Sequence, residues 1–311
     1  EMQRSLVGSE MCIRDRYKVI IQKGQIMKTG IVFEGGAFRT IFSCGVMDAL
    51  VENDIMPDYM IGVSAGAAYG VSMASKQPRR NLDVLMKYRN DKRYLGLSNM
   101  IDKDNKSIYG LEFSYETIPN ELNLFDYDAF KQYKGDFYCV VTNLLTGQPE
   151  YMKYTGDDRT NTVLKATCAL PMLFPPIIIN DVPYMDGGLS DSIPYLKAIE
   201  DGCDRIIVVL TRQSGYTKTT SRSTKAIAYS YRNQYPKLTE TMLTRASRYN
   251  ESLKGLDQYV KEGRIITIQP TTSKGFSRLE KDKNKILSMY NDGYNQCYEL
   301  LDTIKEFYGI K

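Results

Sequence analysis

The sequence contains no histidine, and this absence excludes several kinds of site. A Ser-His-Asp triad cannot form, so a carboxylate, a lysine or a water molecule would have to activate any serine nucleophile. A zinc site would need an unusual ligand set, since imidazole is one of the common ligands of this metal. We therefore expect no metal and no other cofactor.

Long apolar runs, closely spaced cysteines and a strong net charge are also missing. No segment reaches the ~20 consecutive apolar residues of a transmembrane helix. The six cysteines are scattered without metal-ligand spacing, which favours free thiols in a reducing compartment. A net charge of +4 gives no reason to expect nucleic acid as a partner. We expect a cytoplasmic protein; peripheral contact with the inner membrane face and the oligomeric state stay open.

The 311 residues suit one large α/β domain or two small ones. Residues 1–26 show no clear period, and the segment SLVGSEMCIRDR within them resembles a translated sequencing-adapter artefact. We therefore expect a non-native leader, with Met27 as the native start. Strand and helix patterns alternate from Ile31 through Thr211, which predicts a mainly parallel sheet covered on both faces.

The chain after residue 212 has a different pattern of polar and apolar residues. It is polar, with one further strand pattern near Ile265 and an amphipathic helical pattern from Ile286 to Tyr308. We expect a catalytic domain at 27–212 and a mainly helical region at 213–311 packed on it. The irregular stretch 92–125 either covers the site, shapes an acyl groove or is a packed connection.

A nucleophile elbow is predicted at Gly62-Val63-Ser64-Ala65-Gly66. This G-x-S-x-G pattern follows an apolar strand pattern and precedes an alanine-rich helical one, which is the context the motif requires. Gly62 and Gly66 leave room for the strand and the helix to pack around a strained serine. The turn would lift the Ser64 hydroxyl to a helix N-terminus, where developing negative charge is favoured.

A glycine-rich turn follows the first strand, at Glu34-Gly35-Gly36-Ala37-Phe38-Arg39-Thr40. Consecutive backbone N–H groups in such a turn can bind an anion. A nucleotide phosphate loop is one interpretation, but Ala37 and Thr40 occupy glycine positions of the G-x-G-x-x-G pattern. An oxyanion hole one βα unit before the nucleophile fits better, and a tight turn without function is the third alternative.

An aspartate followed by two glycines, Asp186-Gly187-Gly188, comes directly after an apolar strand pattern. Taken alone, this sequence most often forms a simple turn. A proline-rich block, residues 169–176, precedes it.

Together these motifs resemble the patatin-like phospholipase family, in order, over roughly residues 30–212. The glycine-rich loop with Arg39, the serine elbow and the aspartate motif each have a counterpart in that family. Ala37 and Thr40 depart from the family's usual glycines. The region from about Tyr216 to Lys311 is similar to the tail of a bacterial branch of the family.

The resemblance implies a three-layer α/β/α fold that hydrolyses lipid acyl esters with a Ser-Asp dyad and no metal. Ser64 would attack the ester carbonyl, Asp186 would accept the proton, and the N–H groups of Gly35, Gly36 and Ala37 would hold the oxyanion. Gly62, Gly66, Gly187 and Gly188 would support these motifs. Arg39 would either anchor the loop or meet a phosphate head group.

The base poses a physical difficulty, because an ordinary aspartate has a pKa near ~3.9 and accepts a serine proton poorly. Burial against apolar neighbours would raise that pKa. Two alternatives stay open: a general carboxylesterase or thioesterase acting on soluble acyl substrates, and a lipid-binding protein with an idle site.

Overall fold

The computed structural model describes residues 27–103 and 105–310, so the predicted leader at 1–26 lies outside the described residues. Eight strands form one sheet. Their bounds are β1 Thr29–Phe33, β2 Tyr59–Val63, β3 Asp136–Asn143, β4 Pro149–Lys153, β5 Ile177–Ile179, β6 Val182–Asp186, β7 Arg205–Val209 and β8 Ile265–Ile268.

The sheet is mixed, with a parallel centre. Along the order β5-β6-β3-β2-β1-β7-β8, the pairings β3-β2, β2-β1, β1-β7 and β7-β8 are parallel. The strands β4 and β6 each pair antiparallel with β3, and β5 pairs antiparallel with β6. The prediction of a mainly parallel sheet is confirmed for the strands that carry the glycine-rich loop and the elbow.

Helices connect most of these strands. Their bounds are η2 Ala37–Thr40, α2 Ile41–Glu52, α3 Ala65–Ala74, α4 Arg80–Tyr88, α5 Ser98–Ile101, η3 Phe113–Leu122, α6 Tyr127–Gln132, α7 Thr162–Cys168, η4 Gly187–Leu189, α8 Tyr195–Glu200, α9 Arg222–Ser230, α10 Pro236–Lys261, α11 Lys283–Glu299 and α12 Leu301–Tyr308. The irregular stretch 92–125 thus contains α5 and the π-helix η3.

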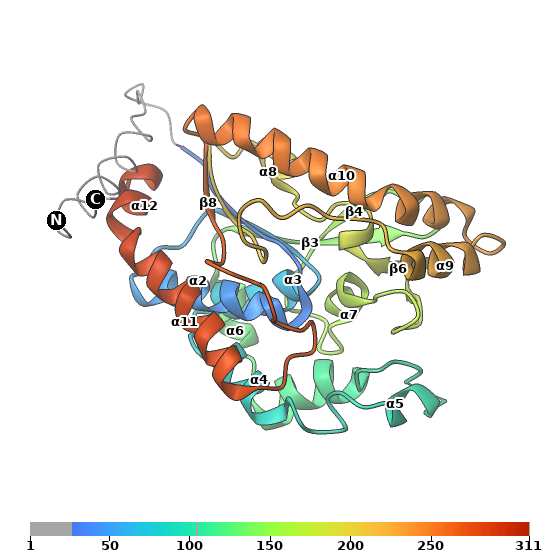
Figure 1. Cartoon of the computed structure of the whole chain (residues 1–311). Helices are drawn as coiled ribbons and strands as arrows, with labels where there is room; N and C mark the ends of the chain where they lie inside the picture. The colour runs from blue at the N-terminus through green and yellow to red at the C-terminus, as the bar shows by residue number, and fades with distance from the viewer. Residues whose placement is uncertain (1–26, 104, 311) are drawn as a thin grey trace.

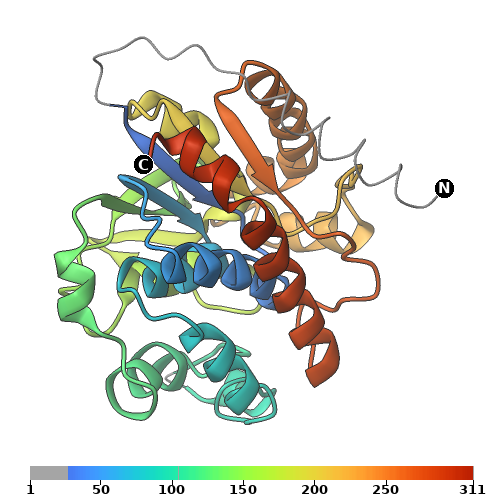
Figure 2. The same cartoon turned by 90° about the vertical axis from the view of Figure 1, so that its left-hand side faces the viewer.

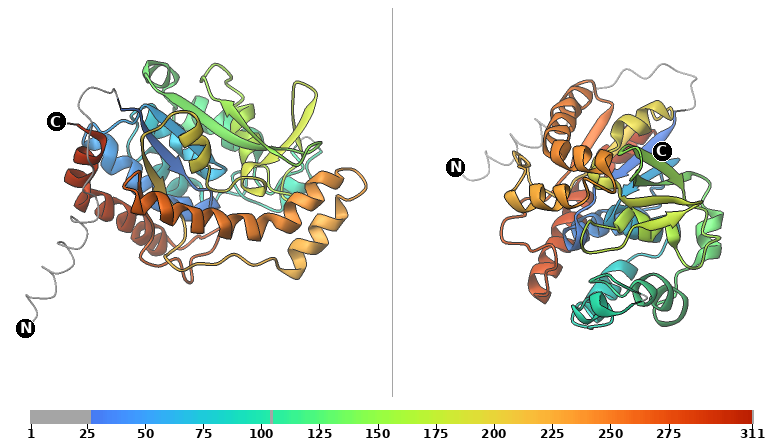
Figure 3. Two further views of the ribbon diagram at one scale, coloured as in Figure 1. Left: turned by 90° about the horizontal axis from the view of Figure 1, so that it is seen from above. Right: turned by 90° about the vertical axis from the view of Figure 1, so that its right-hand side faces the viewer.

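Side chains of the central strands alternate between two apolar cores, which makes the fold three-layered. In β1, Ile31 and Phe33 pack with residues of α2, α3 and α11, whereas Val32 packs with residues of α8 and α10. Figure 1 shows these two helix layers on opposite sides of the sheet, and Figure 3 shows α10 lying across one face. The predicted α/β/α class is confirmed.

The C-terminal region is joined closely to the rest of the chain. Its strand β8 extends the sheet beside β7, and α11 packs against α2 (Figure 2). A Cβ at Gly45 would lie 2.1 Å from the Tyr290 carbonyl oxygen, and one at Gly293 would lie 2.0 Å from the Phe42 carbonyl oxygen. The two helix backbones therefore touch where both lack side chains. The amphipathic pattern up to Tyr308 forms two helices, α11 and α12.

The sheet brings three loops to one edge. Because β1 and β2 are adjacent and parallel, the loops that follow them leave the sheet side by side. Across the sheet, Val63 pairs with Val140, and the next residue, Val141, pairs with Asp186 at the end of β6. This register carries Asp186 to the elbow. Within the described ranges, no helix has the length and apolarity needed to cross a bilayer.

Candidate active site

Ser64 occupies a strained turn between β2 and α3. Its φ is 54° and its ψ is −130°, values that a residue with a side chain adopts only when its surroundings impose them. The two glycines of the motif explain how the turn fits. A Cβ at Gly62 would lie 2.5 Å from the Ala67 nitrogen, and a Cβ at Gly66 would lie 2.5 Å from the Phe33 carbonyl oxygen.

The glycine-rich loop passes directly against this serine. A Cβ at Gly35 would lie 2.7 Å from the Ser64 Cβ. Within the described residues, the backbone N–H groups of Gly35, Gly36 and Ala37 have no hydrogen-bond acceptor. Ala37 begins helix η2 with a φ of 50°. Three unused donors therefore lie beside the serine, as an oxyanion hole requires.

Asp186 ends β6 and is 2% exposed. Its Oδ1 accepts a hydrogen bond from the Gly188 N–H at 2.7 Å. Burial raises the pKa of the Asp186 carboxyl, whereas the polar Ser64 side chain nearby and the charge of Arg245 act in the opposite direction. Gly187 lies against the backbone of β3, where a Cβ would come 2.1 Å from the Val140 carbonyl oxygen. The structure therefore brings the two predicted dyad residues together in a buried setting.

Arg39 is also buried, at 6% exposure. Its Nε has no hydrogen-bond partner among the described residues. Burial lowers the pKa of Arg39 to about 10, and the charges of Arg212 and Arg278 add to that effect. Arg39 therefore lies near other cations, although Glu34 contributes a nearby opposing charge.

Two residues beside the serine were missed by the sequence analysis. Thr167 accepts the Ser64 N–H at 2.9 Å and donates to the Val140 carbonyl at 2.6 Å, which fixes the elbow to β3. Cys168 lies next to both dyad residues, and burial raises the pKa of its thiol to about 12. A thiol with this pKa stays protonated at neutral pH and is a poor nucleophile. Both residues lie in a short helical pattern, and nothing in that pattern indicates that they contact Ser64.

An apolar cavity of about 130 Å³ opens on one side of Ser64. We call it the apolar chamber; its walls include Phe38, Ala68, Tyr109, Ile118, Leu164 and Phe174. The stretch 92–125 supplies part of this wall. Its position matches the interpretation in which this stretch shapes an acyl groove. An apolar cavity of this kind suits a hydrocarbon chain.

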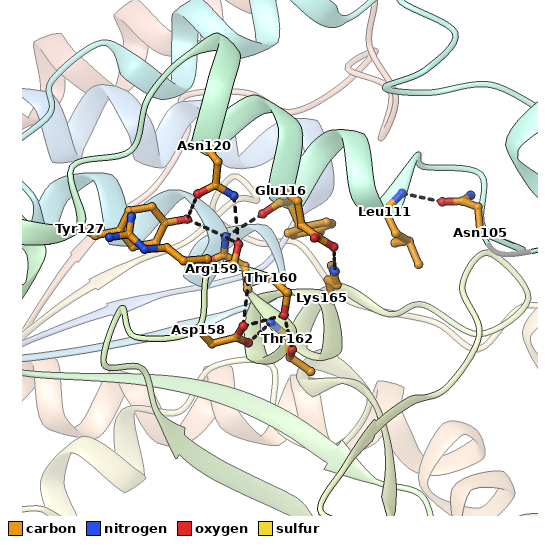
Figure 4. Close-up of polar contacts among 12 residues, drawn as sticks. Asn105, Leu111, Glu116, Asn120, Tyr127, Asp158, Arg159, Thr160, Thr162 and Lys165 are labelled. Carbon is orange, nitrogen blue, oxygen red and sulfur yellow. Dashed lines mark hydrogen bonds and ion pairs between the residues drawn. The ribbon is translucent and has the colours of Figure 1, made fainter.

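Polar contacts outside the chamber hold this wall in place (Figure 4). On η3, Glu116 forms an ion pair with Lys165 of α7 at 2.6 Å, and Asn120 donates to the Arg159 carbonyl at 3.1 Å. The Arg159 guanidinium lies 3.7 Å from the centre of the Tyr127 ring. These contacts tie the wall to the helix that carries Thr167.

A second cavity, of about 50 Å³, opens on the other side of Ser64. We call it the cationic chamber; its charged lining consists of the cations Arg39, Arg212, Lys218, Arg245 and Arg278 and the acids Glu34 and Asp186. Ala37, Ser64 and Leu170 line both chambers. Ser64 therefore lies at the junction of an apolar and a positively charged cavity. In the part of the chain that the structure describes, no group of three metal-binding side chains is present.

Comparison with known proteins assigns the chain to a family. Residues 31–199, more than half of the chain, match the model of the patatin-like phospholipases. The chain belongs to the patatin-like phospholipase family. Residues 235–309 also match a domain of unknown function, DUF6363.

Several relatives align with about three fifths of the chain. Uncharacterized protein YjjU of Escherichia coli is 28% identical over 61% of the chain and 53% of its own length. Lysophospholipase nte1 of Aspergillus terreus is 29% identical over 58% of the chain and 12% of its own length. The chain therefore spans at most about half of these relatives. The crystal structure of VipD from Legionella pneumophila aligns with 90% of this chain and 67% of its own, at 15% identity and a TM-score of 0.44.

Proposed function

We propose that this protein is a serine hydrolase of lipid acyl esters that uses Ser64 and Asp186 as a dyad. One observation carries the proposal: the buried Asp186 carboxyl and Ser64, a serine in the strained elbow conformation, line the same cavity. Burial raises the pKa of this carboxyl. A carboxylate is a stronger base when its pKa is raised. The family and the relatives that carry the name lysophospholipase support a lipid ester as the substrate.

The proposed reaction has two steps. The Ser64 Oγ attacks the ester carbonyl carbon while its proton passes to Asp186, and the N–H groups of Gly35, Gly36 and Ala37 stabilise the oxyanion. The tetrahedral intermediate collapses, and Asp186 returns the proton to the departing alcohol. Water then attacks the acyl-enzyme with Asp186 again as base, which releases the fatty acid and restores the serine.

The chambers support the assignment of the substrate's parts. The apolar chamber suits the acyl chain, and the ester carbonyl would lie at Ser64. We propose residues 27–212 as the catalytic domain and 213–311 as a region packed on it. Because Cys44, Cys139, Cys168, Cys203 and Cys297 are buried free thiols, we also propose a cytoplasmic location.

The dyad is tested by two substitutions. We expect Ser64→Ala and Asp186→Asn each to reduce hydrolysis of a lysophospholipid at least ~1,000-fold, with the double variant little slower, because residues acting as one unit are strongly non-additive. Circular dichroism would verify folding. An Asp186→Asn enzyme that keeps activity within about tenfold of the parent would show that the base lies elsewhere.

The same proteins separate the alternatives. A fluorophosphonate probe labels only an activated serine, so labelling of the parent but not of Ser64→Ala excludes an idle lipid-binding site. A panel of long-chain lipids, short soluble esters and thioesters, with products identified by mass spectrometry, separates the lipid hydrolase from a general esterase or thioesterase.

A further inference from the structure

The cationic chamber holds five cations, and none of them forms an ion pair with a carboxylate of the described residues. The two acids in its lining are already engaged. Glu34 accepts hydrogen bonds from the Thr211 N–H and hydroxyl at 2.6 and 3.0 Å and from the Tyr249 hydroxyl at 2.9 Å. Asp186 accepts a hydrogen bond from the Gly188 N–H at 2.7 Å. Five cations against two carboxylates leave the lining of the chamber with an excess of positive charge.

Holding these positive charges close together is energetically unfavourable. Burial, with the charge of Arg245 next in importance, lowers the pKa of Lys218 to about 7. The buried Nε of Arg39 has no partner among the described residues. Like charges gathered in a partly buried space disfavour one another, and a buried donor without an acceptor is itself unfavourable. A bound anion would remove both penalties.

The chamber is a fixed part of the fold. The backbone carbonyl of Arg278 accepts the Phe38 N–H at 3.0 Å, which attaches that loop to the oxyanion loop. Lys218 exchanges backbone hydrogen bonds with the Asn250 side chain of α10 at 2.9 and 3.0 Å. Its ammonium lies 3.7 Å from the centre of the Tyr249 ring. The cations on the chain after residue 212 are thereby held next to the proposed catalytic serine.

We propose that the cationic chamber binds a phosphate monoester on the head of the acyl substrate, so that the enzyme prefers lipids ending in a dianionic phosphate. This inference rests on the proposed function for the position of the ester. A phosphate monoester carries a charge of about −1.5 to −2 at pH 7, and arginine groups match its oxygens with paired N–H donors. A choline head group would bring a further cation among five and is disfavoured.

The substrate test compares three lipids with one acyl chain: monooleoylglycerol phosphate, its phosphocholine ester and monooleoylglycerol. We expect kcat/KM to be at least ~10-fold higher for the phosphate monoester. The double variant Lys218→Gln/Arg278→Gln should lose at least ~10-fold on that lipid, the scale of a lost hydrogen bond to a charged group, and change less than about threefold on monooleoylglycerol. Lys254→Gln, an exposed lysine on α10, is the matched control. Equal losses on all lipids would overturn the proposal.

Two checks keep the test independent of folding and of catalysis. The single variant Arg278→Gln, at an exposed loop position, should show the same selectivity in a smaller degree. Calorimetry on the Ser64→Ala protein should detect binding of monooleoylglycerol phosphate and, more weakly, of inorganic phosphate. Both binding signals should be lost when the two substitutions of the double variant are added to this protein. Binding of inorganic phosphate without the lipid would identify a free-anion site and overturn the head-group assignment. Binding of neither would overturn the chamber. Lipid binding by a protein that hydrolyses no ester would refute the proposed function alone.

Discussion

The two chambers meet at Ser64, yet the chain builds them differently. The walls of the apolar chamber come from residues between Ala37 and Phe174, all within the segment that matches the patatin-like phospholipase model. The cationic chamber needs Arg212, Lys218, Arg245 and Arg278, which follow that segment. The apolar chamber therefore lies within the segment that matches the family, whereas the positive charge of the cationic chamber depends on the C-terminal part of the chain.

The proposed catalytic groups and the cations of the proposed head-group site therefore lie mostly in different parts of the chain. The proposed dyad and the proposed oxyanion loop lie in the matched segment with the apolar chamber. Arg245 on α10 and Arg278 before α11 belong to the region that matches the domain of unknown function. A change in that region would alter which head group is accepted while the catalytic groups stay in place. We therefore expect some substitutions to change activity according to the head group or the acyl chain of the lipid, and others to change activity equally on all lipids.

The largest of these effects should be the same for lipids with different head groups. Gly36→Pro removes an N–H donor from the proposed oxyanion loop and also forces φ away from the −164° that Gly36 adopts, because proline fixes φ at about −65°. The lost donor alone is worth ~100-fold in kcat or more. Gly36→Ala is the matched control, because its Cβ also lies 2.8 Å from the Thr211 Oγ1 but its N–H remains. We expect the proline variant to be ~100-fold slower than the alanine variant on phosphate-bearing and neutral lipids alike. A loss confined to phosphate-bearing lipids would assign the loop to the cationic chamber.

A smaller effect should depend on the acyl chain alone. Ala68 lies one turn after Ser64 on α3 and lines the apolar chamber. Ala68→Leu would occupy space that a long chain needs, and one methylene in an apolar pocket already changes specificity ~10- to 200-fold. We expect kcat/KM to fall about 10- to 100-fold for a palmitoyl ester and less than about threefold for a butyryl ester. Ala68→Ser, of similar size, should change neither. Equal losses for both chain lengths would mean that the acyl chain binds elsewhere.

The same division explains what the sequence could predict. The proximity of Ser64 to the glycine-rich loop was predictable because each lies in a short motif tied to a strand end, and the parallel register of β1 and β2 brings these strand ends together. Asp186 was singled out by the resemblance to a known family, because its Asp-Gly-Gly motif taken alone most often forms a simple turn. The alternation of strand and helix patterns was also sufficient for the fold class. These signals are local, within a few residues of the chain.

The cationic chamber had no such signal. Arg39 and Arg278 are 239 positions apart in the sequence, and Lys218 lies in a polar segment without periodicity. A lysine or arginine in such a segment is usually solvated, and only the packing of α10 and the 278 loop against the glycine-rich loop brings these cations together. The role of Arg39 was left open for the same reason, because its lack of a partner is a property of the folded surroundings.

The smallest expected effect concerns Arg245, which lies where the cationic chamber meets the dyad. A Cβ at Gly188 would lie 3.0 Å from the Asp186 Oδ1 and 3.4 Å from the Arg245 Nη2, so the two groups face each other across that glycine. The positive charge of Arg245 lowers the pKa of Asp186 against the raising effect of burial, and Arg278 acts in the same direction more weakly. The neighbouring Cys168 thiol, with a pKa of about 12, stays neutral.

Because Asp186 must be ionised to act as a base, activity should rise with pH through its pKa. Arg245→Gln removes a charge that favours the ionised form, so the pKa should increase and the acid limb of kcat/KM on a neutral ester should move to higher pH by about one unit. Arg245→Lys keeps the charge and should leave the limb within about 0.3 units of the parent. A limb that moves equally in both variants would show that Arg245 acts by packing against the Gly188 carbonyl, to which it donates a hydrogen bond. A limb that moves to lower pH would exclude Asp186 as the base whose charge Arg245 stabilises.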